Sequence, residues 1–258
     1  MKSTLSVTFL GTGTSQGIPI IGSRHPVCLS SNPKDKRLRV SVLLQWEDFN
    51  YVIDCGPDFR QQMLREEVRH LNGVLLTHEH NDHIIGLDDI RPFYFRQGDI
   101  SFYAEKRVFE ALKQRFSYVF EIENKYPGAP TLQEIEIDEN SIFSISGKKV
   151  IPVRAMHANL PVLGFRIDDF AYMTDVKTIP TSEMEKLKGL EVLVINALRE
   201  KPHPSHLNLE EALALVEALA PKKAYFTHIS HLLGFHDEVE AQLPENIHLA
   251  YDTLKIHL

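Results

Sequence analysis

Six consecutive residues, His78-Glu79-His80-Asn81-Asp82-His83, decide how this chain is interpreted. They follow Gly73–Thr77, a short apolar run that predicts a buried strand. Imidazole and carboxylate are preferred donors for Zn²⁺ and Mn²⁺, so four such side chains at the end of a strand indicate a metal site. If the segment is extended, alternation points His78 and His80 the same way. The alternative, a polar surface loop rich in histidine, is disfavoured by this spacing.

Further donors are expected elsewhere, because one loop cannot complete the coordination of two metal ions. Three more donors each end a β-prone run: His157 after Val150–Met156, Asp175 after Phe170–Thr174, and His228 after Ala224–Thr227. Any one of them alone would be read as a cap or turn residue. Together with the cluster His78–His83, these three residues are predicted to be further metal ligands.

The remaining pattern predicts an α+β chain. Val40–Trp46 and Tyr51–Asp54 form an expected hairpin, and Asp58–Val68 has helical spacing. Asn208–Leu219 predicts an amphipathic helix with Asn208 and Glu211 as a capping box. We expect one domain over residues 1–258, with two β-rich halves stacked face to face and helices outside.

Composition narrows the class of protein. The 258 residues are 43% hydrophobic and 24% charged, with a formal net charge of -7. Extended nucleic-acid binding is disfavoured, since it needs clustered Lys and Arg. The two cysteines cannot form a disulfide scaffold, and no stretch predicts a signal peptide or a membrane span. A cytoplasmic protein is therefore expected.

A family resemblance covers nearly the whole chain. The stretch His78–His83, the opening TFLGTGTSQG (residues 8–17), YMTDV (residues 172–176) and FTHISH (residues 226–231) resemble the metallo-β-lactamase superfamily. The resemblance implies a four-layer αββα sandwich with two divalent metal ions, Zn or Mn, at one edge.

The resemblance also implies roles for individual residues. His78, His80 and His157 would hold one metal ion, and Asp82, His83 and His228 the other, with Asp175 bridging them. A bridging carboxylate is typical of the phosphodiesterase and nuclease branches. The implied enzyme hydrolyses small or cyclic phosphodiesters with a metal-bridging hydroxide. Asp82 and His206 are the expected catalytic residues, His206 as general acid or as electrostatic partner of the phosphoryl oxygens; His203 is the alternative.

The segments IIGSRHPVC (residues 20–28), NPKDKRLR (residues 32–39) and LDDIRPF (residues 87–93) resemble the PhnP-type branch. Chains of that branch carry three closely spaced cysteines and a later histidine that hold a structural zinc ion. Here the matching positions are Ser23, His25, Cys28 and His231. Serine is a poor zinc ligand, so two interpretations stay open: a three-ligand accessory site of His25, Cys28 and His231, or ordinary surface residues.

Two other functions stay open as alternatives. One is a tRNA 3′-end processing endonuclease, which shares the opening motif and the ligand set but uses a long basic arm that is not evident here. The other is a metal-binding sensor of the same fold without turnover. A homodimer is an expectation from the resemblance alone.

Overall fold

The structure, a computed structural model, describes residues 4–121, 123 and 125–258. The chain divides into two compact units, each assembled from segments far apart in sequence. Unit 1 comprises Met1–Leu10, Ser41–Asp138 and Lys255–His257. Unit 2 comprises Gly11–Val40, Glu139–Leu254 and Leu258. Among the described residues, no helix is long and apolar enough to cross a membrane.

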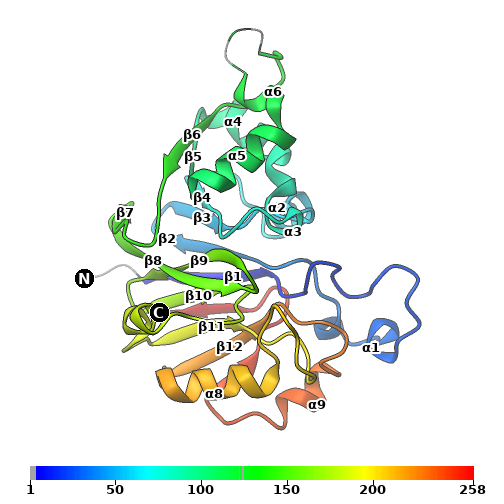
Figure 1. Ribbon diagram of the computed structural model, residues 1–258. Coiled ribbons are helices and arrows are strands. Elements are labelled where there is room, and N and C mark those ends of the chain that lie inside the picture. Colours follow the sequence, from blue (N-terminus) through cyan, green and yellow to red (C-terminus); the bar gives the residue numbers. More distant parts are fainter. Residues whose placement is uncertain (1–3, 122, 124) are drawn as a thin grey trace. The chain divides into compact units, whose positions relative to one another are not determined.

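Unit 1 contains a seven-stranded sheet with the order β14-β1-β2-β3-β4-β5-β6 (Figure 1). Its strands are β1 (Ser6–Gly11), β2 (Ser41–Trp46), β3 (Phe49–Ile53), β4 (Gly73–Leu75), β5 (Ile100–Ala104), β6 (Leu132–Glu136) and β14 (Lys255–His257). Strands β2 and β3 form the expected antiparallel hairpin, whereas β3 to β6 run parallel. Parallel strands end at the same edge of a sheet, so the residues that follow β3 and β4 meet there.

The helices of unit 1 cover one face of this sheet. They are α2 (Phe59–Arg65), α3 (Asn81–Ile84), η2 (Ile85–Ile90), α4 (Arg91–Gln97), α5 (Lys106–Arg115) and α6 (Ser117–Phe120). Phe59 of α2, Phe93 of α4 and Leu112 of α5 are buried in one apolar cluster with Val74 and Phe102 of the sheet. The burial of this cluster fixes α5 against the sheet.

Unit 2 contains a second seven-stranded sheet, with the order β13-β12-β11-β10-β9-β8-β7. Its strands are β7 (Phe143–Ile145), β8 (Lys148–His157), β9 (Leu160–Ile167), β10 (Phe170–Met173), β11 (Val192–Asn196), β12 (Lys223–Thr227) and β13 (Ile247–Leu249). Strands β7 to β10 are antiparallel neighbours, and β10 to β13 are parallel. The parallel part again brings the residues after its strands to one edge.

Short helices complete unit 2. They are α1 (Pro26–Leu29), η1 (Pro33–Asp35), α7 (Thr181–Met184), η3 (Glu185–Leu187), α8 (Leu209–Leu219) and α9 (His236–Glu240). Figure 1 shows α8 alongside β11 and β12, where its buried residues Val216 and Leu219 join the apolar cluster of the sheet. The predicted capping box is confirmed: Asn208 Oδ1 accepts from Glu211 N, and Glu211 Oε2 accepts from Asn208 N, both at 3.0 Å.

A buried arginine ties the opening segment of unit 2 to its last strands. Arg37 donates to Thr12 Oγ1 at 2.7 Å and to the Ala250 carbonyl at 2.5 Å, and its Nη2 lies 3.0 Å from His236 Nδ1. Since a guanidinium only donates, His236 Nδ1 must accept and the ring must be neutral. Burial, together with the adjacent Arg37, lowers the pKa of His236 from 6.5 to about 4.

The neutral state of His236 predicts an acid-sensitive fold. Between the unfolded pKa of 6.5 and the folded pKa of about 4, the unfolded chain binds the extra proton, so stability falls as the pH falls. We expect urea unfolding of metal-free protein to lose about 1–2 kcal/mol more between pH 7 and pH 5 than the His236→Gln variant loses. Glutamine keeps an acceptor for Arg37 but does not titrate. Equal losses in the two proteins would contradict the assignment.

Candidate metal centre

Three residues that begin loops at the sheet edges share an unusual backbone conformation. Asp54 follows β3, Asp175 lies two residues after β10, and His228 follows β12. Their φ angles are 64°, 58° and 54°, the left-handed region that non-glycine residues rarely adopt. Such conformations collect at functional sites, where the surrounding structure holds the side chain in place.

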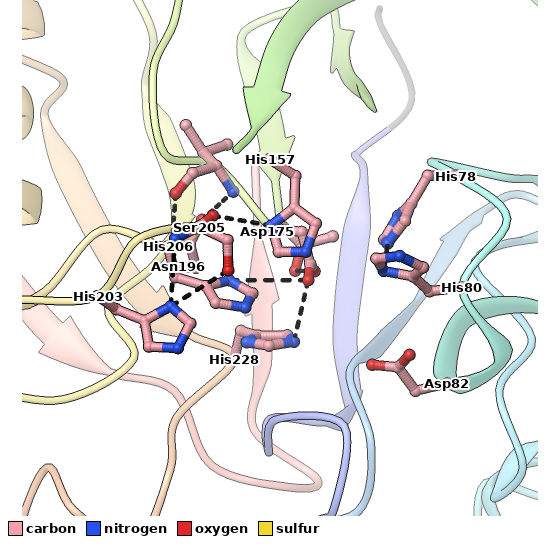
Figure 2. A network of polar contacts seen from close by, with 12 residues as sticks. His78, His80, Asp82, His157, Asp175, Asn196, His203, Ser205, His206 and His228 are labelled. Carbon is pink, nitrogen blue, oxygen red and sulfur yellow. Dashed lines mark hydrogen bonds and ion pairs between the residues drawn. The ribbon is translucent and has the colours of Figure 1, made fainter. Parts of the chain in front are cut away.

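The ligand-rich loop of unit 1 forms a tight group of donors. His78 Nε2 lies 3.0 Å from His80 Nδ1 (Figure 2). The rings of His78 and His83 have centroids 4.1 Å apart. His83 Nε2 lies 3.3 Å from Asp82 Oδ2. His78 and His83 are fully buried, and His80 is exposed. The loop passes close to Gly56, where any side chain would meet the Asp82 carbonyl at 2.0 Å.

Asp54 orients two of these imidazoles. Its carboxylate accepts from Thr77 N and Thr77 Oγ1, both at 2.8 Å, and from His83 Nδ1 at 2.7 Å. Thr77 Oγ1 in turn lies 3.0 Å from His78 Nδ1. These contacts assign the protons to Nδ1 and leave Nε2 of His78 and His83 without a proton, so that it could bind a metal ion, as outer-sphere carboxylates arrange in metal sites. Burial raises the pKa of Asp54, and His83 beside it opposes that shift.

Unit 2 holds a second group of donors. His157, Asp175 and His206 each place a donor atom within 4.8 Å of the others. Asp175 Oδ1 also lies 3.3 Å from His228 Nε2 and 3.8 Å from His206 Nδ1 (Figure 2). The rings of His206 and His228 stack with centroids 4.7 Å apart. A buried carboxylate among three imidazoles is a donor set that suits Zn²⁺ or Mn²⁺.

The second group is positioned by main-chain and side-chain hydrogen bonds. His157 Nδ1 lies 2.7 Å from the Ser205 carbonyl, which assigns the proton to Nδ1 and leaves Nε2 as the donor to a metal. Thr174 Oγ1 donates to Asp175 Oδ2 at 2.7 Å. Asn196, at the end of β11, binds both the N–H and the carbonyl of Val176, at 2.6 and 3.0 Å. Asn196 therefore clamps the turn that carries Asp175.

His206 is neutral in this environment. Burial, followed by the adjacent His228, lowers its pKa from 6.5 to about 3, and Asp175 compensates only in part. Bound metal cations would lower this pKa further, because they also disfavour an imidazolium. The pKa of His203 is lowered by burial and by Arg199. At neutral pH, the uncharged ring of His206 can donate through one nitrogen and accept through the other, but it is not an imidazolium.

The structure assembles the predicted ligands in two sets, each within one unit. His78, His80, Asp82 and His83 lie together in unit 1, and His157, Asp175 and His228 lie together in unit 2. The fit of each set to a metal ion is good, because the buried rings turn a nitrogen toward the other donors. The sequence alone did not indicate Thr77, Asn196 or Ser205, whose roles depend on contacts within the folded unit.

The accessory residues are only partly brought together. The rings of His25 and His231 meet edge to face with centroids 4.7 Å apart. His25 Nδ1 accepts from Val27 N, which caps α1. Cys28 is buried in a small apolar cluster with Ile18 and Val27. Over the described part of the chain, no group of three adjacent metal donors includes any of these residues.

Comparison with known proteins identifies the class. A family model described as the Beta-lactamase superfamily domain matches residues 49–229. The chain belongs to the metallo-β-lactamase superfamily, and the expected α+β class with two multi-stranded sheets is confirmed.

Within the superfamily the chain is a PhnP-type protein. A crystal structure described as a new diphosphatase from the PhnP family is 40% identical, has a TM-score of 0.92, and aligns over 99% of this chain and 97% of its own. An octanoyltransferase of Porphyromonas gingivalis is 41% identical over 248 residues, which are 95% of this chain and 50% of that protein. A ribonuclease Z of Bacillus licheniformis is 22% identical over 204 residues, 74% of this chain and 60% of that protein. The chain thus spans only about half of these two curated relatives.

Proposed function

We propose that this chain is a dinuclear metal-dependent phosphodiesterase that cleaves a small or cyclic phosphoric diester. The observation that carries the proposal is the buried carboxylate of Asp175 among His157, His206 and His228, with Oδ1 3.3 Å from His228 Nε2. A carboxylate in this position can be shared by two cations, as the nuclease and phosphodiesterase branches require. The similarity to a diphosphatase supports chemistry at phosphorus and adds diphosphate diesters to the substrate class.

In this proposal the ligands follow the pattern that the resemblance to the superfamily implies. His78, His80 and His157 would hold one ion, and Asp82, His83 and His228 would hold the other, with Asp175 as the ligand available to both. The nitrogen and oxygen donors suit both Zn²⁺ and Mn²⁺. When bound, such ions supply Lewis acidity and a nucleophile at neutral pH.

The protein groups have distinct tasks in this reaction. Asp54 and the Ser205 carbonyl fix the tautomers of His83 and His157, so that the nitrogen facing the metal carries no proton. His206 contributes the N–H of a neutral imidazole to an oxygen of the phosphoryl group. Asp82 serves as a ligand and helps to orient the attacking water.

The decisive experiment is hydrolysis of bis(p-nitrophenyl) phosphate by metal-stripped protein with Zn²⁺ or Mn²⁺ added back. We expect turnover only with added metal, and two equivalents of metal per chain by elemental analysis. Two bound metals without turnover on this ester or on a diphosphate-linked dinucleotide would overturn the phosphodiesterase assignment and favour a sensor. Failure to bind metal would overturn the proposed centre itself.

A nuclease is the second candidate, because the chain also matches ribonuclease Z proteins. Cleavage of a tRNA precursor at its 3′ end, at a rate well above that of small diesters, would favour this alternative. Because one relative is an octanoyltransferase, an octanoyl thioester should also be tested as a substrate. Metal-dependent cleavage of an octanoyl thioester, without action on phosphoric diesters, would move the assignment to acyl chemistry.

A further inference from the structure

Arg107 of α5 forms an ion pair with Glu79, which lies between the first two histidines of the loop that carries the candidate metal ligands. Glu79 separates His78 from His80, and its carboxylate accepts from Arg107 Nη1. The same guanidinium donates from Nε at 3.2 Å and from Nη2 at 3.0 Å to Glu105 Oε2. The side chains of Arg107, Glu79 and Glu105 are only 27%, 22% and 13% exposed, so water screens these ion pairs incompletely.

The helix that carries Arg107 is a rigid support. Arg107 lies in the first turn of α5, and Val108, Phe109 and Leu112 of that helix are buried in the core of unit 1. The loop lies between β4, which ends at Leu75, and α3, which begins at Asn81, and Asp54 already holds it at Thr77. The ion pair between Arg107 and Glu79 therefore fixes the segment that contains His78 and His80 relative to the packed helix α5.

We infer that Arg107 is a positioning residue that sets the metal affinity of the loop through Glu79. This inference rests on the proposed function, in that His78 and His80 bind a metal ion. The fork of a guanidinium suits the task, since its separate N–H groups reach Glu79 and Glu105 at once. The ligand motif alone does not predict this ion pair, because Arg107 lies 28 residues after Glu79 in the sequence.

Simple electrostatics and positioning predict opposite outcomes. A positive charge near a cation site weakens cation binding, so removing the charge of Arg107 should tighten it if charge alone matters. If Arg107 positions the loop, its removal weakens metal binding despite the gain in electrostatic attraction. The direction of the change therefore separates the two explanations.

The test measures Zn²⁺ affinity by competition with a chromophoric chelator, without reference to activity. We expect Arg107→Gln to weaken the binding of one of the two zinc equivalents about 10-fold or more, as the loss of outer-sphere partners does in other metal sites. Arg115→Gln is the matched control, because Arg115 lies on the same helix and donates to the Ala111 carbonyl in its own turn. That variant should bind zinc within about 2-fold of the wild type.

The partner side of the contact gives an independent check. Glu79→Gln should weaken the same equivalent, and the double variant should be no weaker than the worse single variant, since both remove one interaction. Unchanged or tighter zinc binding by Arg107→Gln, with a native circular dichroism spectrum, would overturn the inference. Absence of zinc binding by the wild type would instead overturn the proposed function. Should Arg107→Gln fold poorly, Glu79→Gln can still reject the inference, by binding zinc as tightly as the wild type does.

Discussion

Asp175→Asn is expected to lower the turnover of phosphoric diesters about 1000-fold or more and to reduce the metal content of the protein. Loss of even one group that stabilises a transition state costs about 10²–10³ in kcat, and Asp175 is proposed to contact both metal ions. Asparagine is the appropriate replacement, because it tolerates the φ of 58° at this position and can still accept from Thr174 Oγ1. Elemental analysis and single-turnover kinetics measure the two effects.

Asp169→Asn provides the control for this substitution. This substitution also removes one negative charge from unit 2. Asp169 is exposed, however, and its Oδ1 lies 3.5 Å from Arg166 Nη2 in the turn between two strands. Its turnover and metal content should match those of the wild type. Two equivalents of metal in Asp175→Asn, held as tightly as in the wild type, would remove Asp175 as a shared ligand.

The candidate ligands could be predicted from sequence because their signals are local. The cluster His78–His83 is contiguous, and His157, Asp175 and His228 each stand at or just beyond the end of a β-prone run. Short runs of alternating or continuous apolar residues suffice to predict strands, and the polar residue that follows is then a natural candidate. The same local logic correctly predicted the capping box of α8.

What could not be predicted depends on contacts between distant residues. The short strands β13 and β14 have weak patterns of their own and exist because they pair with β12 and β1. The helix α3, which carries Asp82 and His83, has only four residues, too few to give a periodic signal in the sequence. Likewise, nothing near Asn196 in sequence indicates that its amide clamps Val176, 20 residues earlier.

The aromatic segment after the metal loop shows why composition alone misleads. Phe93, Tyr94, Phe95, Phe102 and Tyr103 fit a pocket lining, a dimer contact or a core equally well by pattern. In the structure Phe93 and Phe102 belong to the core of unit 1, whereas Phe95 is 60% exposed. The difference arises from which face of α4 or β5 each residue occupies, and that face is set by the packing of the whole unit.

His206→Ala is expected to lower turnover about 100-fold while leaving two metal ions bound. Its pKa of about 3 implies a neutral ring at the pH of the assay, so the side chain acts as an N–H donor to the phosphoryl oxygens. A donor of this kind stabilises the transition state whatever the leaving group is. We therefore expect equal losses on a p-nitrophenyl ester and on an alkyl ester, measured as kcat with saturating metal.

Three outcomes of this experiment separate the roles open to His206. Equal losses with full metal content support the hydrogen-bond donor. A loss confined to the alkyl ester would show that His206 protonates the leaving group, which is one of the two roles that the family resemblance implies. Loss of one metal equivalent would make His206 a ligand, which its donor atom, within 4.8 Å of those of His157 and Asp175, would allow. Because the three roles change different observables, a single variant decides among them.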